Sequence, residues 1–146
     1  MAEPLKRCEV VTAFLRYNDR ILLLRRSADV GTYKGRWAGV SGYLETKSPL
    51  TQAWREIKEE TGLTKRQAHL VCEGDPIEVP APEHNTCWVV HPFLFDIDDP
   101  TDITLDHEHE EQTWILPAEI LGYSTVPSLV KALAVCLERE RSGVVN

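Results

Sequence analysis

The chain has 146 residues, the usual length of a single domain, and 42% of them are hydrophobic. That share of apolar side chains can form an ordinary core, so the chain does not read as intrinsically disordered. With 16 Lys and Arg against 23 Asp and Glu, the formal net charge is −7. A charge of this sign disfavours a protein dedicated to a nucleic-acid polymer, although local cations can still hold a small phosphorylated ligand.

The apolar runs and the cysteine spacing favour a cytoplasmic protein without a membrane span. No run approaches the ~20 apolar residues that a spanning helix needs. Residues 1–6 lack the charged segment and apolar stretch of a signal peptide. Four cysteines lie far apart and form no C-x-x-C pair, namely Cys8, Cys72, Cys87 and Cys136. We expect buried thiols in a reducing compartment rather than a structural zinc site.

The first half of the chain predicts strands that lead into one helix. Residues 8–17 and 21–26 are rich in β-branched, aliphatic and aromatic types, and Asn18-Asp19 between them is a turn signal, so we expect a hairpin. A loop with two glycines follows at 27–36. Residues 37–44 then read as a strand in which small side chains allow a close backbone approach to a ligand.

A helix is predicted between residues 48 and 62. Ser48 is a suitable N-cap, and Pro49 fits the first helical position, where its missing N–H costs nothing. Gly62 suits a left-handed C-terminal residue. Core-facing residues recur at helical spacing in this segment: Leu50, Trp54, Ile57 and Thr61.

The second half predicts further strands and a closing helix. The expected strands are 68–74, 76–80 and 87–96, the expected short helix is 117–121, and the amphipathic C-terminal helix is about 127–141. Pro92 should sit at a sheet edge or a bulge, because proline cannot donate to a ladder. We expect Trp88 to pack in the core rather than to stack on a base.

Glu56, Glu59 and Glu60 gather on one side of the predicted helix, because positions three and four apart are neighbours there. Like charges at this spacing destabilise a helix by roughly a few tenths of a kcal/mol per pair. A hard divalent cation would reverse that effect, since Mg²⁺ takes oxygen ligands and commonly binds together with phosphates. The other reading is a solvated acidic helix face.

A basic cluster precedes this acidic helix. It consists of Arg25, Arg26, Lys34 and Arg36, in or beside the loop at 27–36. Such cations would neutralise the oxygens of a pyrophosphate while a metal polarises the reacting phosphorus. The alternative is that they are ordinary surface charges. The two readings have equal weight for Arg25 and Lys34, and an ordinary surface charge is favoured for any other single residue.

Histidines and carboxylates alternate in residues 105–114, which end on Trp114. Imidazole can ligate a metal or carry a proton, so His107 and His109 with the flanking acids are a candidate zinc or manganese site. The helical H-E-x-x-H spacing of such sites is absent, which disfavours this reading.

Residues 55–63, REIKEETGL, match the second half of the Nudix box, REUxEExGU, where U is a bulky aliphatic residue. The full box, G-x5-E-x7-REUxEExGU, would place a glycine at Ser41 and a glutamate at Lys47. A one-residue gap near Thr46 aligns Gly42 with the box glycine, but Lys47 still replaces the glutamate. The chain therefore resembles a Nudix (MutT-like) hydrolase whose box, at 41–63, has an altered first half.

The resemblance implies an α/β fold, the Nudix-type α/β/α sandwich with a mixed central sheet, formed by residues 1–146 as a single domain. It implies Mg²⁺-dependent cleavage of the diphosphate bond in a nucleoside diphosphate linked to another moiety, with Mn²⁺ as an alternative ion. The implied partner is a small phosphorylated substrate, with no nucleic-acid polymer and no membrane. The oligomeric state stays open and includes a homodimer.

The resemblance also assigns roles to side chains. Its metal ligands would be Glu56, Glu59, Glu60 and the backbone carbonyl of Ser41, and the first two would count as catalytic. Arg55 would brace the glutamates, and Glu108 or Glu110 would act as base or as a further ligand. Phosphate contacts would come from the basic residues Arg25, Lys34 and Arg36.

Lys47 motivates a second hypothesis, because the box glutamate that it replaces helps to orient the metal helix. The alternative function is a catalytically weak or silent Nudix domain that senses a nucleotide or phosphometabolite. An adaptor that binds proteins through Trp and Pro-rich loops has little support. Glu45 offers partial compensation if the loop shifts its register.

Overall fold

The computed structural model describes residues 4–143 and shows a mixed, unclosed sheet of eight strands with two main helices. The strands are β1 (Lys6–Tyr17), β2 (Arg20–Arg26), β3 (Trp37–Ala38), β4 (Val40–Tyr43), β5 (Ala68–Glu73), β6 (Ile77–Ala81), β7 (Thr86–Ile97) and β8 (His109–Ile115). The helices are α1 (Pro49–Thr61) and α2 (Leu129–Arg141), with 3-10 turns η1 (Pro82–His84), η2 (Pro100–Asp102) and η3 (Pro117–Gly122). Residues 1–3 and 144–146 of the predicted domain lie outside the described part.

Two long strands, β1 and β7, form the centre of the sheet and run parallel to each other. All other strand pairs are antiparallel. On the side away from β7, β1 pairs first with β4 and, further along the strand, with β2. On the side away from β1, β7 pairs first with β6 and, further along, with β5. Strands β3 and β8 complete the sheet by pairing with β2.

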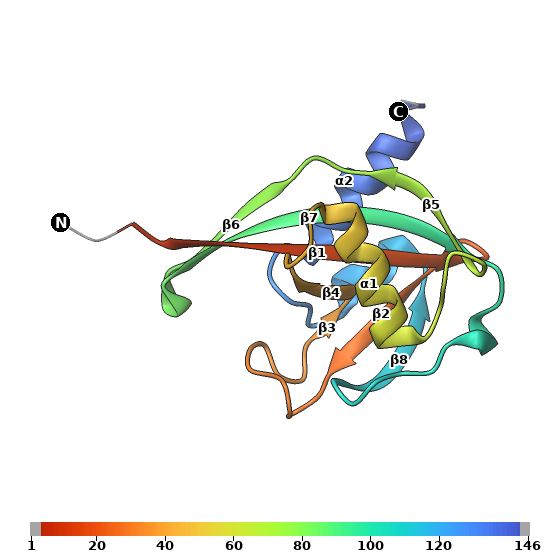
Figure 1. Ribbon diagram of the computed structural model, residues 1–146, viewed down its shortest axis with the longest axis horizontal. Coiled ribbons are helices and arrows are strands. Elements are labelled where there is room, and N and C mark those ends of the chain that lie inside the picture. Colours follow the sequence, from red (N-terminus) through yellow and green to blue (C-terminus); the bar gives the residue numbers. More distant parts are fainter. Residues whose placement is uncertain (1–3, 144–146) are drawn as a thin grey trace.

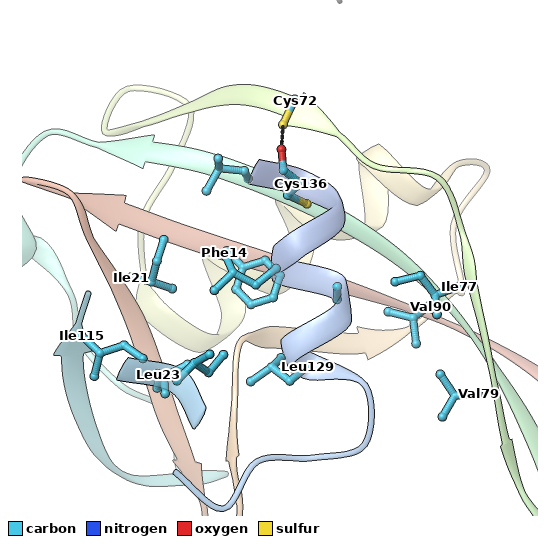
Figure 2. Packing of buried hydrophobic residues seen from close by; sticks show 14 residues of the cluster. Phe14, Ile21, Leu23, Cys72, Ile77, Val79, Val90, Ile115, Leu129 and Cys136 are labelled. Carbon is cyan, nitrogen blue, oxygen red and sulfur yellow. Dashed lines mark hydrogen bonds between the residues drawn. The ribbon is translucent and has the colours of Figure 1, made fainter. Parts of the chain in front are cut away.

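The two helices cover opposite faces of this sheet (Figure 1). Alternate residues of a strand point to opposite faces, so Phe14 packs with α2 while Leu15 belongs to the cluster beneath α1. Figure 2 shows the α2 side, where Leu129 packs near Leu23 and Phe14. The predicted α/β/α sandwich with a mixed sheet is confirmed.

The boundaries of α1 agree with those predicted from its capping residues. The Ser48 hydroxyl accepts the N–H of Thr51 at 3.1 Å, Pro49 begins the helix, and Gly62 ends it with a φ of 77°. The hairpin is also as predicted, with Asn18 and Asp19 both in the left-handed region that a two-residue turn requires.

Two strand predictions need correction. Pro92 lies within an interior strand rather than at an edge, opposite Thr12 of β1. On the other side of β7 it falls between the segments paired with β6 and β5, so a missing N–H there interrupts no ladder. The strand expected at 37–44 is divided at Gly39 into β3, which pairs with β2, and β4, which pairs with β1. The backbone of β1 passes close to Gly39, where an added Cβ would lie 3.1 Å from the Ala13 carbonyl oxygen.

The C-terminal segment differs slightly from the prediction. The short helix at 117–121 is the 3-10 turn η3, and α2 begins two residues later than expected, after Ser128 with a φ of 64°. Within residues 4–143, no helix is long and apolar enough to cross a membrane.

All four cysteines are free thiols. Cys72 and Cys136 are buried as expected, and the Cys72 thiol donates to the Cys136 carbonyl at 3.2 Å (Figure 2). Cys8 and Cys87 are only half-buried.

Candidate active site

The acidic residues of α1 divide into two inward-facing carboxylates and one outward-facing carboxylate. Glu56 and Glu60 are only 9% and 3% exposed, whereas the side chain of Glu59 is 53% exposed. Glu59 accepts a hydrogen bond from Arg55 Nε at 3.1 Å, and the bracing role of Arg55 stays a prediction.

Glu56 is held between a buried amide and a glycine. Gln52 Nε2 donates to Glu56 Oε2 at 3.1 Å, and Gln52 Oε1 accepts the N–H of Glu45 at 2.8 Å. On the facing strand β4, a Cβ on Gly42 would overlap the Glu56 carboxylate. Only glycine at this position therefore leaves room for the carboxylate as it stands.

Glu60 lies deeper, between β4 and the start of β8. The Ser41 N–H donates to Glu60 Oε2 at 3.2 Å. The other oxygen, Oε1, is buried without a hydrogen-bond partner in the described structure, although His109 Nε2 lies 3.4 Å away. The second ring nitrogen of His109 contacts Asp106 Oδ1 at 2.8 Å.

Both buried carboxyls resist losing their protons. Burial raises the pKa of Glu56 from 4.5 to about 7, with a further contribution from the Glu59 charge and an opposing one from the Gln52 hydrogen bond. Burial, followed by the charge of Glu56, holds the pKa of Glu60 well above its ordinary value. A buried carboxylate pair of this kind is stabilised by a proton or by a cation.

A cavity of about 330 Å³ opens beside Glu56. Its acidic lining comes from Glu45, Glu56, Glu59 and Glu108. Ser41 and Gly42 of β4 also line it, as does Arg26 at the end of β2. Carboxylates, a strand backbone and a cation thus face one space.

Aromatic side chains form another part of the cavity wall. Trp88 Nε1 donates to the Tyr33 hydroxyl at 3.2 Å, and the Trp88 and Tyr43 rings lie 6.2 Å apart with an interplanar angle of 38°. Trp88 also packs against the core cluster on the α2 side, so the core expectation for this residue is only partly met. The cavity offers flat apolar surface together with charge.

Several residues expected to contact substrate lie elsewhere. Arg25 donates to Glu111 at 2.7 Å and lies 3.9 Å from Glu110, so these three side chains form an ion cluster outside the cavity lining. Arg36 donates to the Thr125 carbonyl, and Lys34 is exposed and also absent from the lining.

The residues fit a hard divalent cation, although no set is already arranged around one point. Within residues 4–143, no three His, Cys, Asp or Glu side chains converge closely enough to hold an ion. The unpartnered oxygen of Glu60 and the burial of Glu56 nevertheless leave two carboxyls that a cation would stabilise in their charged form. Carboxylate and carbonyl oxygens are the donors that Mg²⁺ and Mn²⁺ prefer.

Comparison with known proteins places the chain in a family. The Nudix domain model matches residues 6–135. The MutT protein of Methanosarcina mazei Go1 is 25% identical, with 97% of this chain and 98% of that chain covered and a TM-score of 0.69. An Ap4A hydrolase of C. elegans, solved as a binary complex, is 20% identical over 96% of this chain and 100% of that chain, with a TM-score of 0.70, and shows the shared fold.

A third similar structure is larger. The bifunctional NMN adenylyltransferase/ADP ribose pyrophosphatase of Francisella tularensis, complexed with AMP and a manganese ion, is 25% identical; the match covers 94% of this chain and 43% of that chain, with a TM-score of 0.72. No curated protein matches significantly.

The chain belongs to the Nudix family. Its general class is that of the Nudix pyrophosphohydrolases, as the sequence predicts.

Some site residues escaped the sequence prediction. Gln52 precedes Glu56 by four positions, a helical spacing that was available as a signal. The sequence indicates His109 only as a ligand of a separate site, and it gives no reason to prefer Arg26 to Arg25. For these two, the deciding contacts are with distant parts of the chain.

Proposed function

We propose that this protein is a Mg²⁺-dependent pyrophosphohydrolase, able to use Mn²⁺, that cleaves the diphosphate of a nucleoside diphosphate linked to another moiety. The observation that carries the proposal is the Glu56 carboxylate, buried against Gly42 in the wall of a cavity that Glu59 and Glu108 also line. The AMP and manganese ion of the Francisella tularensis structure support a nucleotide substrate and a divalent ion.

The metal ligands in this proposal are Glu56, Glu59, Glu60 and the carbonyl of Ser41. When bound, the ion supplies Lewis-acid polarisation of phosphate oxygens and lowers the pKa of water. Arg55 keeps Glu59 in place through its hydrogen bond. Burial of Glu56 and Glu60 excludes water from their carboxyl groups, so their charge acts at low dielectric constant.

Glu108 is the better candidate for the residue that accepts a proton from the attacking water, because it lines the cavity and Glu110 does not. Arg26 donates to the Thr32 carbonyl at 3.0 Å and presents its charge at the cavity, where it suits a phosphate group. Contacts from Arg25, Lys34 and Arg36 to substrate stay predictions, since none of the three lines the cavity as it stands. The aromatic wall suits a flat base.

The test is a phosphate-release screen of nucleotides and nucleotide conjugates with product identification, run on the wild type and on Glu59→Gln. We expect at least one diphosphate-linked compound to be hydrolysed with Mg²⁺ and the variant to lose most of that activity. Wild-type turnover by Glu59→Gln would overturn the assignment.

Lys47 favours a second candidate, a sensor that binds such a ligand without turnover. Lys47 is exposed, and the amide of Gln52 already joins the preceding loop to α1. Calorimetry with Mg²⁺ and each compound separates the two functions, since binding without hydrolysis across the panel identifies the sensor. The cytoplasmic location and a homodimer stay predictions, and light scattering measures the latter.

A further inference from the structure

His109 is a buried histidine beside the metal helix that no proposed step uses. Its side chain is 3% exposed, and that of Glu60 is 4% exposed. His109 begins β8 opposite Arg26, at a point where the register between β2 and β8 shifts. The His109 imidazole is buried, whereas the preceding histidine, His107, is exposed.

The ring contacts one carboxylate at each nitrogen. Nδ1 lies 2.8 Å from Asp106 Oδ1, a hydrogen-bond distance at which the carboxylate accepts and Nδ1 carries the hydrogen. That contact fixes the orientation of the ring and presents Nε2 to Glu60 Oε1, 3.4 Å away. Carboxylate–histidine pairs of this type orient side chains around metal sites.

The backbone couples the Asp106–His109 pair to the end of α1. The Asp106 N–H donates to the Glu60 carbonyl at 3.3 Å, and the Thr104 N–H donates to the Thr61 carbonyl at 2.9 Å. The segment before β8 is therefore attached to the same helical turn that carries Glu60. The Ser41 N–H holds Oε2, and the His109 ring lies 3.4 Å from the remaining oxygen, which has no hydrogen-bond partner in the described residues.

We propose that His109, oriented by Asp106, is a positioning residue that fixes the carboxylate of Glu60 for binding of a divalent ion. The inference rests on the proposed function, because it takes Glu60 as a ligand. His109 acts through Glu60 and does not touch the substrate.

The test is a calorimetric titration of the metal-free protein with Mn²⁺, using two substitutions that each keep half of the contacts. Gln at position 109 places a polar amide group near the position of Nε2, toward Glu60, and Asn places one near Nδ1, toward Asp106. We expect His109→Ala and His109→Asn to weaken Mn²⁺ binding about 10- to 100-fold. We expect His109→Gln to recover most of that loss, and His107→Ala to bind as the wild type.

Urea unfolding of each variant accompanies the titration. Equal Mn²⁺ affinity for His109→Gln and His109→Asn, or wild-type affinity for His109→Ala, would overturn the inference. Glu56→Gln in the same titration distinguishes the two levels of the proposal. If it binds Mn²⁺ like the wild type, the proposed metal site itself fails; if it loses binding while His109→Ala does not, only the role of His109 fails.

Discussion

The buried amide of Gln52 joins two parts of the altered Nudix box, because it donates to Glu56 at 3.1 Å and accepts from the Glu45 backbone at 2.8 Å. The first contact orients a proposed metal ligand. The second anchors the loop in which Lys47 replaces a glutamate. Gln52 thus provides a connection between loop and helix that does not depend on position 47.

Gln52→Ala should lower kcat/KM for the best substrate of the screen by about 10- to 100-fold, the usual effect of removing a partner that orients a metal ligand. It leaves Glu56 without its donor and the Glu45 N–H without its acceptor. Steady-state kinetics at several Mg²⁺ concentrations measure the effect. Lys58→Ala, an exposed position on the same helix, is the matched control, and equal kinetics for the two variants would contradict the prediction.

Gly42→Ala should impair metal binding while leaving the fold intact. The added Cβ meets the Glu56 carboxylate, which is the flexible end of its side chain and can swing away. We expect Mn²⁺ affinity and kcat/KM each to fall by at least about tenfold, with an unchanged far-UV spectrum. Gly31→Ala is the control, since an added Cβ there meets nothing within 4 Å. Unchanged Mn²⁺ affinity in Gly42→Ala would show that Glu56 is not a ligand.

Glu108→Gln and Glu110→Gln distinguish the two candidate bases. Glu108 lines the cavity, while Glu110 lies in the ion cluster with Arg25. We expect Glu108→Gln to lower kcat by about 10²-fold or more and Glu110→Gln to stay near the wild type. Rate profiles against pH should show loss of one limb only for Glu108→Gln. The opposite ranking of the two variants would move the proton acceptor to Glu110.

The metal-free protein should lose stability as the pH rises from 4.5 to about 7. Burial raises the folded-state pKa of Glu56 across this window, so the folded protein binds a proton that the unfolded chain has released. This stabilisation is complete below the pKa that Glu56 has in the unfolded chain, and it is lost as the pH rises past the pKa that Glu56 has in the folded protein. The free energy of unfolding changes by up to about 3 kcal/mol over this window. Urea unfolding in a chelator measures it. Glu56→Gln should remove the Glu56 part of the loss while that of Glu60 remains, added Mg²⁺ should reduce the loss, and a flat wild-type profile would contradict the shift.

The boundaries of α1 were predictable because its signals are local. Ser48, Pro49 and Gly62 each act within one helical turn, and the box motif lies in the same segment. The sandwich followed from the family resemblance carried by that motif.

The residues of the cavity wall were less predictable because they depend on register. Arg25 and Arg26 are adjacent and chemically identical, and neighbouring residues of a strand point to opposite faces, which leaves Arg26 at the cavity and Arg25 among Glu110 and Glu111. Which of the two faces carries the cavity depends on how β2 pairs with β8, and no local pattern encodes it. The contact of His109 with Glu60 likewise joins segments that only the folded sheet brings together.

The parallel pairing of β1 with β7 has a consequence for how the protein folds. Arg16 and Asp96 are neighbours across this pair although 80 positions separate them. The complete box is synthesised before any of β7, so a nascent chain that ends at residue 85 contains every α1 glutamate but lacks the strand whose Phe93 and Phe95 form the floor beneath the helix. Closing so long a loop is slow compared with forming a helix. Strands β1, β2, β4 and β5 supply the other sheet residues of the cluster beneath α1, so this cluster is complete only after β7 has been synthesised.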